Sequence, residues 1–230
     1  MDSKAFTVFL NQISTSPISV LHPDIPLNKY VAIDLSSANS SLDSFDISSA
    51  NAWENYLQNF LEKNNKTVAF GGYLEKRNLY QRSDYFNTAT SQNSRNIHLG
   101  IDLWLPANSG VFTPFDAVVH SFKNNTNFGD YGPTIILKHQ IDEVDFFTLY
   151  GHLSLKSISS LKVGQSFKAG QEIATLGDAS VNGNYAPHLH FQIIRNMQGN
   201  YGDYPGVCSV DTLADYKENC PNPNTILKLY

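Results

Sequence analysis

The feature that most constrains the fold is a series of strand-length apolar segments between residues 110 and 194. They read GVFTPFDAVVHSF, GPTIILKHQ, VDFFTLYGHLS, VGQSFKAGQEIATLG and PHLHFQII. Glycine and proline recur every few residues, and no second long helical period interrupts the series. This pattern is typical of antiparallel β-structure. It predicts a mainly β fold with a curled antiparallel sheet of the barrel-sandwich type over 66–230, in which the tail beyond Tyr204 is irregular wrapping chain.

The first 65 residues have a different pattern. KYVAIDLS (29–36) alternates like a strand, and SSANAWENYLQNFLEKNN (48–65) has helical periodicity with Ser48 or Ser49 as the cap. The sequence therefore predicts a small α+β segment over 1–65, apart from the β domain over 66–230. Because so short a helix is not stable alone in water, we expect its apolar face to dock on the β domain.

Composition excludes some function classes. The 230 residues are 41% hydrophobic with a net charge of -5 and no long basic run, so they favour a packed core and give no support to nucleic-acid binding. No apolar stretch is long enough to span a membrane. The start, MDSKAFTVFLNQISTS, lacks the pattern of a secretory signal, so we expect a cytoplasmic location, with the cell envelope as the alternative. Cys208 and Cys220 are expected to be free thiols rather than a disulfide. The sequence carries no signal from which an oligomeric state could be predicted.

Histidine and aspartate alternate with apolar residues in RNIHLGIDLWLP (95–106). On a strand, His98 and Asp102 would share one face, with Gly100 leaving open the space between them. An imidazole and a carboxylate held together in this way suit zinc. The alternative is a half-exposed strand with two polar residues facing water.

Two further segments carry histidines in positions typical of a site. His188 and His190 share one face of the segment PHLHFQII, and His152 follows a strand and a glycine in TLYGHLS. Each alone has a structural alternative, as a strand or turn histidine, but together with HxxxD the combination is far more specific. The remaining histidines, His22, His120 and His139, are interpreted as structural or surface residues.

The order HxxxD, then YGHLS, then HxH resembles the lysostaphin/LytM-type zinc metallopeptidases. These are β-sheet endopeptidases that cut peptide cross-links and stems of bacterial peptidoglycan. The flanking text, HLGIDLWLPANSGVFTPFDAVV, YGPTIILKHQ and VGQSFKAGQEIATLGD, is similar to that family over about 95–195. Shorter stretches, AIDLS, GGYLEKRNLY, GDYPGV and CPNPNTIL, resemble a branch found fused to class-III aminotransferase-like enzymes.

The resemblance implies a LytM-like core in which His98, Asp102 and His190 bind Zn²⁺ and His152 and His188 are catalytic without binding it. Three protein ligands leave a fourth position for water, which zinc acidifies toward neutral pH. One of the two catalytic histidines would then be the general base and the other a hydrogen-bond donor. No glutamate stands beside a zinc histidine as in HExxH, which disfavours a glutamate base.

The substrate implied by the resemblance is peptidoglycan or a related peptide. The alternatives are another, cytoplasmic, peptide or amide substrate, or a non-catalytic module of the same fold. Residues of GGYLEKRNLYQRSDYF, just before the first ligand, are candidates for substrate contacts. They are Tyr73, Glu75, Arg77 and Tyr80, and Arg77 could meet a substrate carboxylate through two hydrogen bonds. The alternative is that this stretch packs the N-terminal segment onto the β domain, where that segment could narrow the cleft or fill the open zinc position.

Overall fold

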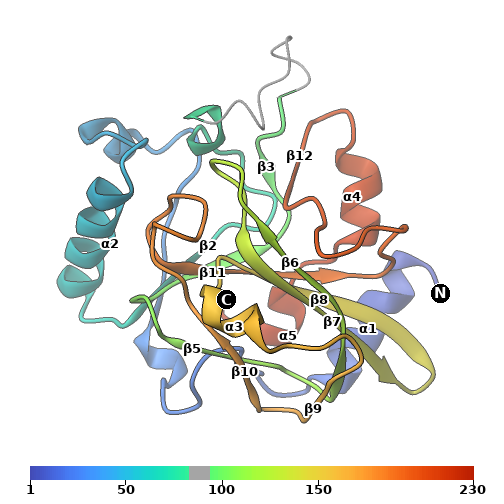
Figure 1. The fold of residues 1–230 in the computed structure, drawn as a ribbon. Coiled ribbons are helices and arrows are strands. Elements are labelled where there is room, and N and C mark those ends of the chain that lie inside the picture. Colours follow the sequence, from blue (N-terminus) through green and yellow to red (C-terminus); the bar gives the residue numbers. More distant parts are fainter. Residues whose placement is uncertain (83–93) are drawn as a thin grey trace.

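A large sheet forms the centre of the molecule. The computed structural model describes residues 1–82 and 94–230. Eight strands lie in the order β1-β2-β4-β11-β8-β7-β6-β9 (Figure 1). Neighbouring strands are antiparallel except for the edge pair β1 and β2, which is parallel. Two smaller sheets pair β5 with β10 and β3 with β12.

The strands are β1 (Tyr30–Ala32), β2 (Val68–Gly71), β3 (Ile97–His98), β4 (Ile101–Trp104), β5 (Gly110–Phe112), β6 (Ala117–Asn125), β7 (Gly132–Ile141), β8 (Val144–Gly151), β9 (Ser166–Phe167), β10 (Glu172–Thr175), β11 (His188–Ile194) and β12 (Val207–Cys208). The helices are α1 (Ser3–Ile13), α2 (Ala50–Asn64), α3 (Leu155–Ser159), α4 (Leu213–Asn219) and α5 (Asn224–Leu227), with 3₁₀ turns at Leu27–Lys29, Ser40–Ser44 and Leu79–Arg82.

The predicted mainly β fold with a large antiparallel sheet is confirmed, but two details differ. Within residues 1–82 and 94–230 the large sheet does not close into a barrel, because β1 and β9 remain as its edges. The tail beyond Tyr204 is also more regular than predicted, since it contributes β12, α4 and α5. Short helices of this kind carry too little periodicity to stand out in a sequence.

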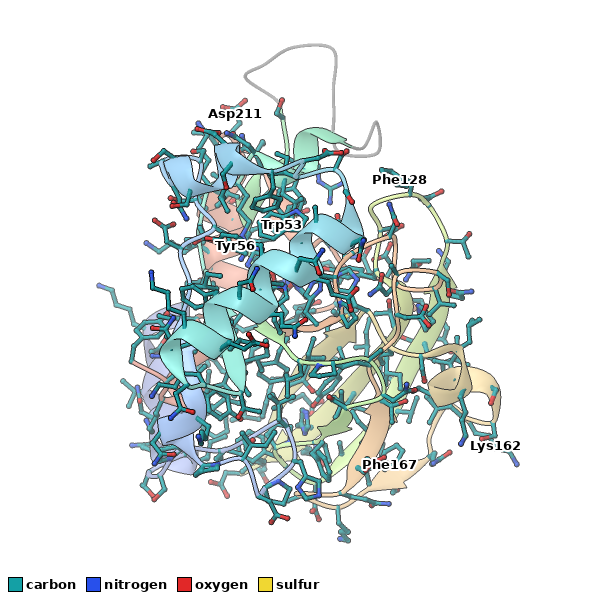
Figure 2. All side chains as sticks on the ribbon, turned by 90° about the vertical axis from the view of Figure 1, so that its left-hand side faces the viewer. Trp53, Tyr56, Phe128, Lys162, Phe167 and Asp211 are labelled. Atoms are coloured by element: carbon teal, nitrogen blue, oxygen red, sulfur yellow. The ribbon has the colours of Figure 1, made fainter. Side chains whose placement is uncertain are left out.

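The predicted helix of the N-terminal segment is α2, which begins after Ser49, whose hydroxyl accepts from the Ala52 amide at 3.3 Å. Its buried Trp53 and Leu57 pack in one cluster with Trp104 of β4, as expected for docking (Figure 2, which faces α2). The predicted strand at 29–36 is shorter, because only Tyr30–Ala32 pairs with β2.

Helix α1 was not predicted. Its N-cap is Asp2, whose carboxylate accepts from the Ala5 amide at 2.8 Å, and its Phe6 and Phe9 rings pack edge-on against Phe146 of β8. Figure 1 shows α1 and α2 on opposite sides of the molecule. Residues before position 65 therefore share hydrophobic clusters with the sheet on both sides, and the domain boundary at 65 stays a prediction.

Cys208 and Cys220 are buried free thiols, as predicted. Among the described residues, no helix combines the length and the apolar character that crossing a membrane requires.

Candidate metal centre

Adjacent strands bring the predicted site residues together. In the β4–β11 ladder, Asp102 lies directly opposite His190, and β11 continues into a ladder with β8 on its other side. His190 is paired there with Gly151, so His152 follows directly at the end of β8. His98 ends the short strand β3, which pairs with β12. Segments that lie far apart in the sequence thus meet around the neighbouring strands β4, β11 and β8.

Donor atoms of His98, Asp102 and His190 converge on one point. His98 Nε2 lies 2.9 Å from His190 Nδ1, and these nitrogens lie 3.2 and 3.1 Å from Asp102 Oδ1. Ligand atoms about 2.0–2.2 Å from a tetrahedral zinc ion would lie roughly 3.4 Å apart, close to these separations. All three residues are buried, and their donor set is the one that zinc prefers. The residues present therefore fit a zinc ion.

Hydrogen bonds on the far side of each imidazole select the tautomer that a metal ligand needs. His98 Nδ1 lies 3.0 Å from the Gly72 carbonyl, so it carries the proton and Nε2 keeps its lone pair. His190 Nε2 lies 2.9 Å from Gln192 Oε1, so its Nδ1 keeps the lone pair. The Gln192 amide is oriented in turn by donating to the Pro205 carbonyl at 3.2 Å. Such outer contacts orient metal ligands and raise their basicity.

Gly100 allows the donor residues to approach one another. A Cβ there would lie 2.8 Å from the His190 ring and 2.7 Å from the Phe191 carbonyl oxygen. Gly100 thus leaves open the space between the side chains, as predicted, but the strand expected within 95–106 does not run on without a break. The chain bends at Leu99 and Gly100 and splits into β3 and β4, and His98 and Asp102 are both buried. The alternative of two water-facing polar residues is thus wrong.

His152 and His188 face each other beside the three donor residues. Their ring centroids are 4.1 Å apart, and His188 Nε2 lies 3.9 Å from Asp102 Oδ1. Each Nδ1 donates to a backbone carbonyl, His152 to Asn182 at 2.8 Å and His188 to Ala186 at 2.7 Å. Each Nε2 therefore keeps its lone pair, as a proton acceptor requires.

The backbone at His152 is also unusual. Its φ is 62°, in the left-handed region, while its N–H donates to the Tyr131 carbonyl and its C=O accepts from Gly177, both at 2.9 Å. Such a conformation persists only where the surroundings fix it, and residues of this kind concentrate at functional sites. The fixed backbone aims the imidazole into the cluster.

Burial determines the charge states at the site. It lowers the pKa of His98 to about 3 and, together with the neighbouring His188, holds the pKa of His152 well below its ordinary value. Burial also lowers the pKa of His188. For Asp102 burial opposes the charge, but His98 and Arg77 overcome it and hold the pKa of the carboxyl well below its usual range. The Asp102 carboxylate beside the neutral imidazoles of His98, His152 and His188 is a suitable environment for a divalent cation.

The four predicted substrate contacts divide into two groups. Tyr80 and Arg77 line the pocket over the histidines, together with Trp53 from α2. Tyr73 instead donates to the Cys220 carbonyl at 2.6 Å, and Glu75 binds the Leu35 amide at 2.9 Å. Arg77 is 1% exposed.

The predicted two-bond contact of Arg77 with a substrate carboxylate does not fit this geometry. Its Nε donates to Glu75 at 2.6 Å and its Nη1 to Asp102 Oδ2 at 2.5 Å. Only Nη2 lacks a partner among the described residues. The stretch around it does connect the N-terminal segment with the β domain, which was the stated alternative.

Sequence reasoning missed two residues that contact the histidines. Gln192 follows His190 on the same face of β11, so the period of two along the strand could have identified it. Tyr131 packs its ring 5.1 Å from that of His190 and 5.6 Å from that of His152, and its hydroxyl lies 3.4 Å from His190 Nε2. It lies in a loop before β7 with no local signal.

The other three histidines lie outside this cluster, in agreement with their structural interpretation. His139 is fully buried between the Asp116 carbonyl at 3.0 Å and the Thr148 hydroxyl at 2.7 Å. His22 packs edge-on against Phe112, and His120 lies beside Ser121.

Comparisons with known proteins agree with the site. Residues 96–201, which contain all five site residues (four histidines and one aspartate), match the model described as Peptidase family M23. No curated protein matches the chain.

Several solved structures are also similar. The catalytic domain of lysostaphin from Staphylococcus simulans is 22% identical, with 71% of this chain and 97% of that chain covered and a TM-score of 0.39. A zinc-containing peptidase from Vibrio cholerae is 26% identical, with 47% and 30% covered and a TM-score of 0.36. A candidate M23 peptidase from Pseudomonas aeruginosa is 18% identical, with 58% and 44% covered and a TM-score of 0.39. The chain thus spans less than half of the last two proteins. The narrower resemblance to modules fused to aminotransferase-like enzymes stays a prediction.

Proposed function

We propose that this chain, whose residues 96–201 match the model of Peptidase family M23, is a zinc-dependent endopeptidase that hydrolyses peptide bonds of peptidoglycan-type peptides. The observation that carries the proposal is the convergence of His98 Nε2, Asp102 Oδ1 and His190 Nδ1 within 3.2 Å of one another. In this assignment these three residues hold the zinc ion, and His152 and His188 act on the substrate and the water.

Zinc, when bound, supplies an acidified water and polarises the scissile carbonyl. The proton released from the water needs an acceptor, and His152 and His188 each present a free Nε2. Since each Nδ1–H is already donated to a backbone carbonyl, either ring can donate from Nε2 only after it has taken a proton. One histidine therefore takes the proton as general base, and the imidazolium so formed stabilises negative charge on the substrate oxygen before it returns the proton to the leaving amine nitrogen.

The neighbours of the two histidines support this role. Their ring centroids lie 4.1 Å apart, so two adjacent positive charges would repel each other and the pair takes up only one additional proton at a time. Trp104 stacks on His188 at 5.5 Å and Tyr185 packs edge-on against His152 at 5.0 Å. These rings exclude water and keep the imidazoles in place.

The experiment that tests the proposal has two parts. Metal analysis of the purified protein is expected to give one zinc per chain, lost in His190→Ala. Digestion of purified peptidoglycan, followed by mass spectrometry of the released muropeptides, is expected to show new peptide amino and carboxyl ends.

The outcomes distinguish the alternatives. Zinc without any cleavage of muropeptides or of a peptide library would indicate a non-catalytic module of the same fold. Cleavage of library peptides but not of muropeptides would support a peptide hydrolase whose substrate is not peptidoglycan. A protein that binds no zinc would overturn the proposal.

A further inference from the structure

The hydrogen bond between Arg77 and Asp102 gives the buried arginine a role in the metal centre. Resting on the zinc site proposed above, we propose that Arg77 is a positioning residue that fixes Asp102 with one oxygen toward the metal and sets the charge of the centre. Arg77 lies outside residues 96–201, which match the peptidase family model. The positioning residue is therefore supplied by the segment that precedes the matched residues.

The two oxygens of Asp102 have different partners. Oδ1 lies 3.2 Å from His98 Nε2 and 3.1 Å from His190 Nδ1, at the point where the donor atoms converge. Oδ2 points the other way and accepts from Arg77 Nη1 at 2.5 Å. The terminal torsion of an aspartate has a broad energy minimum, so a carboxylate without this contact could rotate. The guanidinium thus selects which oxygen faces the metal.

Arg77 is itself held on several sides. Its Nε donates to Glu75 Oε2 at 2.6 Å, and its guanidinium lies 5.8 Å above the Trp104 ring. The Tyr80 hydroxyl lies 3.4 Å from Nη1. A lysine would keep the charge but could not bind both carboxylates through one planar group. The arrangement therefore needs an arginine.

Glu75 connects this network to the N-terminal segment. Its Oε1 accepts from the Leu35 amide at 2.9 Å, and the Lys76 carbonyl accepts from the Ser37 amide at 2.8 Å. A Cβ at Gly72 would collide with the Glu75 carboxylate. The Gly72 carbonyl also accepts from His98 Nδ1 at 3.0 Å. Residues 72–77 thus support two metal ligands at once.

Arg77 also affects the charge of the metal centre. Arg77 and Asp102 are both almost fully buried, with side chains 2% and 3% exposed, so water screens their interaction little. Part of the negative charge of Asp102 is therefore directed toward the guanidinium rather than the metal. A ligand set that donates less charge leaves a bound cation a stronger Lewis acid.

The test measures metal binding rather than hydrolysis. Zinc affinity of the apo protein is measured by competition with a chromophoric chelator, and the visible spectrum of the Co²⁺ form reports ligand geometry. The variants are Arg77→Lys, the charge-balanced pair Glu75→Gln with Arg77→Gln, and Lys76→Gln as the matched control. Lys76 is exposed and adjacent in sequence, so its loss removes a nearby positive charge without touching the network. Circular dichroism and thermal unfolding check the fold of each variant.

We expect both Arg77 variants to bind zinc about 10- to 100-fold more weakly, as is typical for outer contacts of metal ligands, and to show an altered Co²⁺ spectrum. Lys76→Gln is expected to match the wild type. Unchanged zinc affinity and an unchanged Co²⁺ spectrum in folded Arg77→Lys would overturn the inference and leave a purely structural ion pair. If Arg77→Lys stayed unfolded even with zinc present, the inference would likewise be overturned, because the ion pair would then be needed for folding. A wild-type protein without zinc affinity would instead refute the proposed function itself.

Discussion

Replacing Gly100 by alanine is the smallest change that should disturb the metal centre. The new methyl carbon would lie 2.8 Å from the Cε1 and Nε2 atoms of His190, where ordinary contacts begin at 3.4 Å. The ring must then move by roughly 0.6 Å, whereas metal–ligand distances tolerate only about 0.2 Å. The other close neighbour, at 2.7 Å, is the Phe191 carbonyl oxygen, which is held in the sheet and cannot move away.

The magnitude follows from the strain. Overpacking of this kind costs about 1–3 kcal/mol. The apo variant can relax by displacing His190, but metal binding must push the ring back against the methyl group. The strain then opposes binding, which weakens zinc affinity by roughly 5- to 150-fold.

The assay compares zinc dissociation constants, from chelator competition, with the free energy of unfolding of the apo proteins. Gly110→Ala is the matched control, because its nearest contacts are the ends of the Phe112 and Glu172 side chains, which can move. We expect the control to bind zinc like the wild type. A folded Gly100→Ala protein whose zinc affinity lies within twofold of the wild type would refute the steric reasoning.

Further predictions concern the groups around the ligands and the two sides of the sheet. His152→Ala and His188→Ala are expected to retain zinc by metal analysis and to lose about 10²- to 10⁴-fold in the rate of peptide cleavage; equal loss of metal would reverse their roles. Gln192→Leu removes an acceptor from a ligand imidazole, so zinc affinity should fall about 10- to 100-fold in a chelator titration. Burial lowers the pKa of His139 from 6.5 to about 4, so between these values the unfolded chain binds a proton that the folded chain does not. His139 alone should therefore lower the free energy of unfolding by about 3 kcal/mol as the pH decreases through this window, and His139→Gln should reduce the slope of the curve by that contribution in acid-denaturation experiments. Trp53→Ala is expected to cost about 3–5 kcal/mol in urea unfolding, because the side chain is buried between α2 and the sheet.

The site could be predicted because its residues obey strand periodicity. His188 and His190 stand two apart on β11, and Asp102 stands in the strand that pairs with it. The spacing of two along each strand places these side chains on a common face, whatever the rest of the chain does. His152 follows a strand end, which is also visible locally. The fold class followed from the same period and from the recurring turn residues.

Other parts of the fold depend on contacts that no local pattern encodes. Helix α1 is stabilised by packing of Phe6 and Phe9 against Phe146, more than a hundred residues away. The strand predicted over 29–36 is cut to Tyr30–Ala32, because only these residues find partners, Val68–Phe70, in a parallel pair. Closure of the sheet likewise depends on whether its two edge strands meet, which is a property of the whole chain.

Arg77 illustrates why the role of a residue is harder to predict than its presence at a site. An arginine between tyrosines just before the first ligand is compatible with a substrate contact, since guanidinium groups bind carboxylates. Which carboxylate it binds depends on the path of the chain from residue 72 to residue 77 along β3. The amide of Arg77 donates to the Asn96 carbonyl at 2.9 Å and that of His98 to the Glu75 carbonyl at 3.0 Å. These two backbone bonds fix the arginine beside Asp102, so the nearest carboxylate is one that the protein itself supplies.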